Sequence, residues 1–215
     1  MRKLILKMSL SADGFVGGPN GEIDWIFRSG NDETTAWNMK TLSQAGVHIM
    51  GSRTFHDMAS YWPTSDEPFA APMNEIPKIV FTRKGTIENS TDELTNAMKD
   101  ARVNSEGLFN TADTISLHAS TWTHATVATG DLATEITKLK QQIGKPILAH
   151  GGAGFAQSLI GAGLVDEYRL LIQPVILGKG LPLFSTVDVP FDLKLECSTV
   201  FKTGAIANVY TTIRK

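Results

Sequence analysis

The sequence predicts an α/β fold whose central mixed sheet is mostly parallel and ends in an antiparallel edge. Three short apolar segments, at residues 47–50, 77–81 and 146–149, each run into a polar turn, which is typical of buried parallel strands. Helical and strand patterns alternate around them, as in other parallel sheets. The later segments 166–172 and 207–213 have strand propensity with partial alternation, so we expect them to form the antiparallel edge.

Each further element follows from its own pattern. Asp131 can cap a helix whose apolar residues keep the 3.6-residue period until Gly144, the clearest helix in the chain. Glycines around residues 14–21 predict a flexible loop after the first strand, and we expect this loop to be a mobile lid. The remaining expected elements are strands at residues 4–10 and 193–201 and helices at about 35–45, 54–61 and 153–160.

Composition narrows the class of protein. The 215 residues, 42% of them hydrophobic, predict one domain spanning residues 1–215. The net charge is −2 without a basic run, which disfavours nucleic acid and favours a small-molecule partner. The single cysteine, Cys197, fits a reducing cytoplasm, and the apolar N-terminal stretch is too short for a signal peptide or a membrane span. We therefore expect a cytoplasmic protein without a membrane partner.

The polar turns after the three apolar strands predict a ligand site. Gly151 and Gly152 precede a helix, so backbone amides and the helix N-terminus can approach an anion such as a dinucleotide pyrophosphate. The alternative is that the glycine pair only makes a tight turn. If the strands are parallel, the turns at 51–54 and 82–84 lie at the same carboxyl edge, where open α/β sheets bind ligands. Their arginines and lysine suit phosphates.

Several other residues have a functional and a structural interpretation. Asp13 orients substrate or relays a proton to it, or is only a turn former. His150 donates a proton near neutral pH, or is a hydrogen-bonded residue at a strand end. Trp25 stacks on a substrate ring or fills the core, and Lys179 meets a substrate phosphate or is solvated. The histidines at 48, 56, 118 and 124 are interpreted as surface residues, and no metal site is expected.

Four segments in this order resemble a known family. They are Ser-Ala-Asp-Gly-Phe at 11–15, Met-Gly-Ser-Arg-Thr-Phe at 50–55, His-Gly-Gly-Ala at 150–153, and Asp-Glu-Tyr at 166–168 followed by Gly-Lys-Gly-Leu-Pro-Leu-Phe at 178–184. The chain resembles the dihydrofolate reductase-like superfamily, and within it stand-alone relatives of the C-terminal reductase domain of bacterial riboflavin biosynthesis. The segment at 84–121 is not covered well by this pattern and is interpreted as a surface insertion.

The resemblance implies a three-layer fold, a homodimer and an enzyme that uses NADPH. It implies hydride transfer to a pyrimidine or pterin-like substrate, as in 5-amino-6-(5-phosphoribosylamino)uracil reductase, with the protein orienting the cofactor. Asp13 would be catalytic, and Asp13, Trp25 and Lys179 would bind substrate. The cofactor would be bound by Ala12, Gly17, Gly51, Ser52, Arg53, Thr54, Thr82, Arg83, His150, Gly151, Gly152, Ala153 and Phe155.

Three departures from the family pattern keep alternatives open. Ser52 stands where the family often has arginine, so the residue that selects NADPH is Arg53, Arg83 or Lys84. His150 replaces a common glutamate, which affects the identity of the substrate. The folate enzymes place a carboxylate a few residues beyond the loop tryptophan, whereas here the first acid after Trp25 is Asp32. The alternatives are a dihydrofolate reductase and a non-catalytic dinucleotide-binding module.

Overall fold

The protein is represented by a computed structural model that describes residues 1–87, 96, 99–100, 103 and 120–213. These residues form an eight-stranded sheet with the order β4-β3-β2-β5-β1-β6-β8-β7. The first six strands of this order, from β4 through β6, are parallel. Strands β8 and β7 follow β6 and form an antiparallel edge. The mixed sheet predicted from sequence is therefore confirmed. The strands are β1 Leu4–Ser11, β2 Val47–Gly51, β3 Lys78–Phe81, β4 Thr126–Ala128, β5 Ile147–Ala149, β6 Glu167–Gln173, β7 Leu193–Val200 and β8 Ile206–Thr212.

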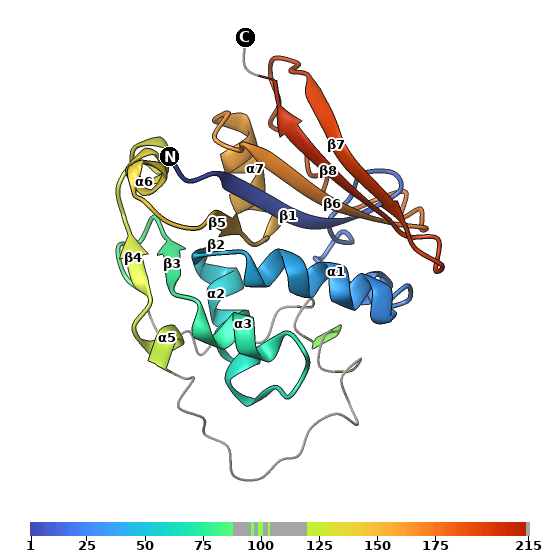
Figure 1. Ribbon diagram of the computed structural model, residues 1–215, viewed down its shortest axis with the longest axis horizontal. Coiled ribbons are helices and arrows are strands. Elements are labelled where there is room, and N and C mark those ends of the chain that lie inside the picture. Colours follow the sequence, from blue (N-terminus) through green and yellow to red (C-terminus); the bar gives the residue numbers. More distant parts are fainter. Residues whose placement is uncertain (88–95, 97–98, 101–102, 104–119, 214–215) are drawn as a thin grey trace.

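Helices cover both faces of the sheet. Figure 1 shows α6 and α7 on one face and α1, α2 and α3 on the other, so the expected three-layer arrangement is confirmed. The α-helices are α1 Asp32–Ser43, α2 Ser52–Ala59, α3 Ala70–Glu75, α5 Ser120–Thr123, α6 Leu132–Gln141 and α7 Ala153–Gly161. Short 3-10 turns lie at Asp24–Ile26 and Trp62–Thr64. No helix among the described residues has the length and apolar character needed to cross a membrane.

Alternation along β1 divides the core between the two faces. Leu4 and Leu6 pack in the cluster under α6 and α7, whereas Ile5 packs in the cluster with α1, α2, α3 and α5. Because successive side chains of a strand point to opposite faces, Lys7 belongs to the α1 side of the sheet. The otherwise apolar strand β1 therefore places one lysine, Lys7, on the face of the sheet covered by α1.

Helix boundaries follow local capping. Asp131 caps α6 as predicted, its carboxylate accepting a hydrogen bond from the Thr134 amide at 2.9 Å. The helix ends before Ile143, which is fully exposed and not part of its apolar face. Helix α1 begins three residues earlier than predicted because Asn31 and Thr34 form a reciprocal capping box. Strand β4 and helices α3 and α5 were not predicted. Most of the 84–121 segment lies outside the described residues.

The glycine-rich loop after β1 is tied to the loop that precedes β7. The Val16 amide donates to the Leu181 carbonyl and the Leu181 amide to the Gly17 carbonyl, each at 2.9 Å. Gly180 allows this approach because a Cβ there would lie 2.2 Å from the Gly17 carbonyl oxygen. Gly17 and Gly18 are buried, so this part of the loop is packed against its neighbours, and the expected role of residues 14–21 as a mobile lid remains a prediction.

A buried ion pair joins α6 to the start of β1 and β6. The Lys140 ammonium lies 2.7 Å from the Asp166 carboxylate and also donates to the Leu164 carbonyl at 2.6 Å. The same carboxylate accepts a hydrogen bond from the Leu4 amide at 2.8 Å. Removing Asp166 would leave this amide without its acceptor and Lys140 without a negative charge to balance its own, with only the Leu164 carbonyl as acceptor.

We expect Asp166→Ala to lower the free energy of unfolding by about 3 kcal/mol, because the buried Lys140 charge loses its partner. The exposed ion pair Glu135–Lys138 provides the control, and Glu135→Ala should cost less than about 1 kcal/mol. Denaturant unfolding of both variants measures the difference. Equal losses in the two variants would contradict the anchoring role.

Candidate functional site

The sheet topology brings three of the predicted turns together. Strands β3, β2 and β5 are adjacent and parallel, so the turns that follow them lie at one carboxyl edge, as the sequence predicted. Strand β5 also lies beside β1. The chain leaves β1 through α1 toward β2 and leaves β5 through α7 toward β6, that is, in opposite directions along the sheet. This switch in direction marks the ligand-binding crevice of open α/β sheets.

The turns after β2 and β5 are in direct contact. The Gly152 amide donates a hydrogen bond to the Thr54 hydroxyl at 2.8 Å. A Cβ at Gly51 would lie 3.4 Å from the Cβ of Phe155, so the glycine lets the end of β2 approach the start of α7. The Phe81 ring, at the end of β3, lies 5.3 Å from the Phe155 ring. The peptide bond between Gly151 and Gly152 is cis.

Two helices begin at this contact without side-chain caps. Gly51 is the N-cap of α2 and Gly152 is the N-cap of α7, and neither helix start has a capping side chain. Their first amides and the positive ends of both helix dipoles therefore converge on the same edge. This arrangement suits an anionic ligand.

The basic residues predicted for this edge are at its surface. Arg53, in the first turn of α2, and Arg83, after β3, are both exposed. The Thr82 hydroxyl accepts a hydrogen bond from the Lys84 amide at 3.1 Å, which shapes the turn. The predicted roles of Ser52, Arg53, Thr82 and Arg83 in cofactor binding remain predictions.

Asp13 holds two loops together. Its exposed carboxylate accepts hydrogen bonds from the amides of Gly178 at 2.7 Å and Leu177 at 3.2 Å. A hydrogen bond from Ser11, assisted by these amides, keeps the pKa of the Asp13 carboxyl below its usual value. The carboxylate is therefore ionised at neutral pH and can accept a hydrogen bond but not supply a proton. Lys179, next to Gly178, is exposed beside it, and the substrate-binding roles of both residues remain predictions.

Trp25 does not offer a stacking surface. Its side chain is 2% exposed, and its indole N–H donates to the Glu22 carbonyl at 3.2 Å. Stacking on a substrate would need an exposed ring face. The predicted role of Trp25 in substrate binding is therefore wrong, and its packing role holds.

The α1 side of the sheet contains a group of buried bases that the sequence interpretation missed. This base cluster consists of Lys7 on β1, His48 on β2, Lys78 on β3, and His150 directly after β5. The rings of His48 and His150 lie 4.6 Å apart in an edge-to-face arrangement. His48 is completely buried, so its interpretation as a surface residue is wrong.

Three ring nitrogens of the cluster make no hydrogen bond of good geometry. They are both nitrogens of His48, although the Leu42 carbonyl lies close enough to affect its pKa, and Nε2 of His150. The expectation that His150 is a hydrogen-bonded strand-end residue holds only for its backbone amide, which donates to the Ile49 carbonyl at 2.9 Å. Unpaired polar groups are uncommon in protein interiors and require an explanation.

Burial keeps the histidines neutral. Burial, reinforced by the Lys78 charge and opposed by the Leu42 carbonyl, lowers the pKa of His48 to about 3. Burial, followed by His48, Lys7 and Lys78, holds the pKa of His150 well below its usual value. The cluster therefore contains two neutral imidazoles at physiological pH.

The two lysines are also perturbed. Lys78 donates to the Thr121 hydroxyl at 2.7 Å and lies 4.4 Å from the centre of the Trp122 ring, and burial lowers its pKa to about 7. Lys7 keeps part of its surface exposed, yet packing around the amine lowers its pKa to about 8. A lysine inside an otherwise apolar strand, as at Lys7, is the sequence signal that would have identified the cluster.

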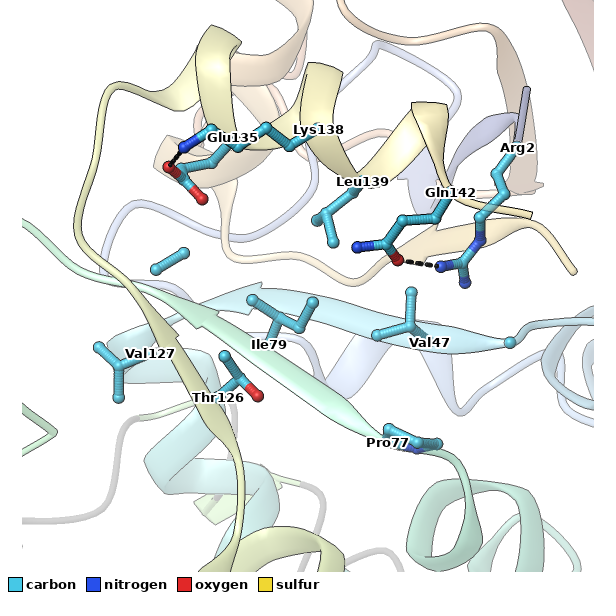
Figure 2. Close-up of a pocket in the computed structure, with 12 residues that line it drawn as sticks. Arg2, Val47, Pro77, Ile79, Thr126, Val127, Glu135, Lys138, Leu139 and Gln142 are labelled. Atoms are coloured by element: carbon cyan, nitrogen blue, oxygen red, sulfur yellow. Dashed lines mark hydrogen bonds and ion pairs between the residues drawn. The ribbon is translucent and has the colours of Figure 1, made fainter. Parts of the chain in front are cut away.

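A separate cavity of about 450 Å³ lies between α6 and strands β2 to β4. Figure 2 shows its charged side chains paired with neighbours, Glu135 with Lys138 at 2.8 Å and Arg2 with Gln142 at 3.2 Å. Val47 and Pro77 place it near the amino ends of β2 and β3. The glycine turns lie at the opposite ends of these strands, so we assign the candidate site to the turns.

Residues 2–207 match the family model of the RibD C-terminal domain, and the chain belongs to this family. The fold and the glycine turns thus define a reductase-like domain. Among relatives, the Bacillus subtilis (strain 168) protein named "Uncharacterized protein YyaP" is 29% identical over 209 residues, covering 97% of this chain and 94% of its own length. The resemblance proposed from the sequence motifs is therefore confirmed.

Solved structures support the fold. The diaminohydroxyphosphoribosylaminopyrimidine deaminase/5-amino-6-(5-phosphoribosylamino)uracil reductase of Thermotoga maritima has a TM-score of 0.61 at 17% identity, over 99% of this chain and 57% of that protein. Dihydrofolate reductase from Enterococcus faecalis, solved with NADP(H), has a TM-score of 0.55 at 13% identity, over 99% of this chain and 97% of that protein. The dihydrofolate reductase-like fold is thus confirmed.

We expect the protein to lose stability as the pH falls from about 6.5 toward 3. The unfolded chain binds protons on His48 and His150 in this range, whereas the folded protein, with Lys7 and Lys78 facing the imidazoles, does not. Each histidine contributes up to about 1.4 kcal/mol per pH unit. His48→Gln should reduce the slope of the unfolding free energy against pH relative to the wild type. An unaltered slope in His48→Gln would contradict the assignment.

Proposed function

We propose that this protein is an NADPH-dependent oxidoreductase that transfers hydride to a pyrimidine or pterin-like small molecule, similar to 5-amino-6-(5-phosphoribosylamino)uracil reductase. The observation that carries this proposal is the meeting of two uncapped helix starts, at Gly51 and Gly152, at the switch point of a RibD C-terminal domain. The name of the Thermotoga maritima neighbour includes this reductase activity. The Enterococcus faecalis neighbour was solved with NADP(H).

Different residues at the carboxyl edge would bind different parts of the proposed cofactor. The amides at the starts of α2 and α7, from Ser52 to Thr54 and around Ala153, would hold the pyrophosphate. Thr82 and Arg83 after β3 would meet the adenosine end. Ala12 and Gly17, beyond the end of β1, would lie beside the nicotinamide, because β1 and β5 are adjacent. The bound cofactor supplies the hydride, and the protein positions it and excludes water.

The opposite side of the edge would hold the substrate. Asp13 is ionised and anchored by Gly178, so it is suited to accept a hydrogen bond from a ring N–H of the substrate. Lys179, exposed in the same loop, would meet a phosphate or other anion. The expected homodimer and cytoplasmic location belong to this proposal as well.

The dihydrofolate reductase alternative is less well supported. Asp32, the first acid beyond Trp25, lies in the exposed first turn of α1. It does not supply a buried carboxylate for a pterin ring. Dihydrofolate-dependent oxidation of NADPH that is blocked by antifolates would restore this alternative.

We expect Gly152→Ala to weaken NADPH binding at least about tenfold, which corresponds to about 1.4 kcal/mol. A Cβ at this position would lie 3.1 Å from the Thr54 hydroxyl and fill the turn, whereas a Cβ at Gly154 meets nothing within 4 Å. Gly154→Ala is therefore the matched control and should bind as the wild type does. Calorimetric titration measures both affinities, with circular dichroism to verify folding. Equal affinities in the two variants would place the cofactor elsewhere.

The selection of NADPH over NADH is tested separately. We expect Arg53→Ala to lower the affinity for NADPH by about tenfold and to leave NADH binding unchanged, because the exposed guanidinium would contact the 2′-phosphate. Arg83→Ala is the comparison variant, and a loss confined to it would assign the contact to Arg83 instead. If the wild type binds neither nucleotide, the reductase proposal fails and the non-catalytic module is also excluded as a dinucleotide binder.

A further inference from the structure

The base cluster lies directly beneath the proposed cofactor turn. The register between β1 and β5 pairs Leu6 with Ala149, so the next residues, Lys7 and His150, are neighbours on the α1 side of the sheet. His150 in turn precedes Gly151, the first residue of the glycine turn. A planar ring bound next to this turn would therefore lie beside the cluster.

The cluster contains bases without an acid to balance them. Neither Lys7 nor Lys78 forms an ion pair with any residue that the structure describes. The Lys78 ammonium makes a hydrogen bond to Thr121 and a cation–π contact with Trp122, and both partners are neutral. Glu167 lies on the same face of β6 but is paired with Arg169 at 2.8 Å. It also accepts from Lys3 at 3.5 Å. The positive character of the cluster is therefore not neutralised by this carboxylate.

Arg169, the cation next to the base cluster on β6, already has hydrogen-bond partners. The Arg169 guanidinium, besides its contact with Glu167, donates to the hydroxyl of Thr41 at 3.3 Å and to the side-chain oxygen of Gln44 at 2.9 Å. Helix α1 presents the apolar Leu42 to the same layer. Buried polar atoms without a partner in this layer include the histidine nitrogens of the base cluster and Oδ1 of Asn38 on α1.

The donor set indicates the charge of its ligand. A lysine ammonium offers only hydrogen-bond donors, and each neutral imidazole offers one donor. A metal ion or an amino group would be repelled by the two lysines. A carboxylate or a ring oxyanion would accept hydrogen bonds from the lysines and from the one N–H of a neutral imidazole, and Nε2 of His150 has no partner in the protein.

The cluster is also reachable. His48 and Lys78 are almost completely buried, but Lys7 and Ser9 on the same face of β1 keep partial exposure. These residues lead along β1 toward the carboxyl edge and Asp13. An anionic substituent at this edge would therefore meet Lys7 first, whereas His48 is completely buried behind it.

We propose that Lys7, His48, Lys78 and His150 form a subsite for an anionic oxygen group of the compound that is reduced. The substrate class is then a heterocyclic acid, with a carboxylate or an ionised ring oxygen held on the cluster. This inference rests on the proposed reductase function and specifies the substrate of that same site. It makes His48 and His150 specificity-determining residues.

The test compares two ligands of the same shape and different charge. Uracil-6-carboxylate and its neutral isostere uracil-6-carboxamide are titrated into the full chain saturated with NADPH. We expect the carboxylate to bind at least about tenfold more tightly, since charge-assisted hydrogen bonds are about twice as strong as neutral ones. Lys7→Met and His48→Gln should abolish the preference without changing NADPH affinity. Lys138→Met, on the exposed surface of α6, is the control and should retain it.

The outcomes separate the two proposals. If NADPH binds but the two ligands bind equally, or if the preference survives in both variants, the base cluster is not the anionic subsite. If NADPH does not bind to the wild type, the proposed function fails. If His48→Gln does not fold, Lys7→Met decides the question, because Lys7 is partly exposed and tolerates an uncharged side chain of similar length.

Discussion

The placement of β5 between β2 and β1 is the constraint on which the site depends. Its three residues are all buried and pair with both neighbours, so β5 links strands that are far apart in the sequence. This pairing brings the Gly151 turn against the start of α2, where Thr54 accepts its hydrogen bond. A shift of one residue in register would turn His150 to the other face and move the glycines away from α2. The position of the glycine turn in the candidate site is therefore determined by the pairing of β5 with its neighbours.

The same alternation determines the electrostatics below the sheet. In β1, even-numbered residues fill the core under α6 and α7, which leaves the odd-numbered positions for the α1 side. Lys7 lies beside His150 on this face because β1 and β5 are adjacent. His48 also contacts His150 on the same face, because β2 is the other neighbour of β5. Buried apolar clusters on both faces of the sheet surround the strands that hold these groups.

Local patterns predicted most of the framework, and nonlocal contacts account for what they missed. The strands that carry the three turns, and the helix capped by Asp131, have signals within a few residues. The burial of His48 depends on α1 and on its neighbours in the sheet, which no local pattern contains. The glycine loop looked flexible because its restraints come from Leu181, far along the chain. Trp25 likewise gives no local sign of which ring face is covered.

Family membership defines the scaffold more firmly than the substrate. The resemblance implies a glutamate before the paired glycines, whereas here His150 occupies that position beside Lys7. Replacing an acid by a neutral base next to a lysine removes a negative charge from the subsite and leaves donors in excess. The family fold alone therefore does not define the compound bound beside His150, and the proposed substrate class rests on the residues of the base cluster.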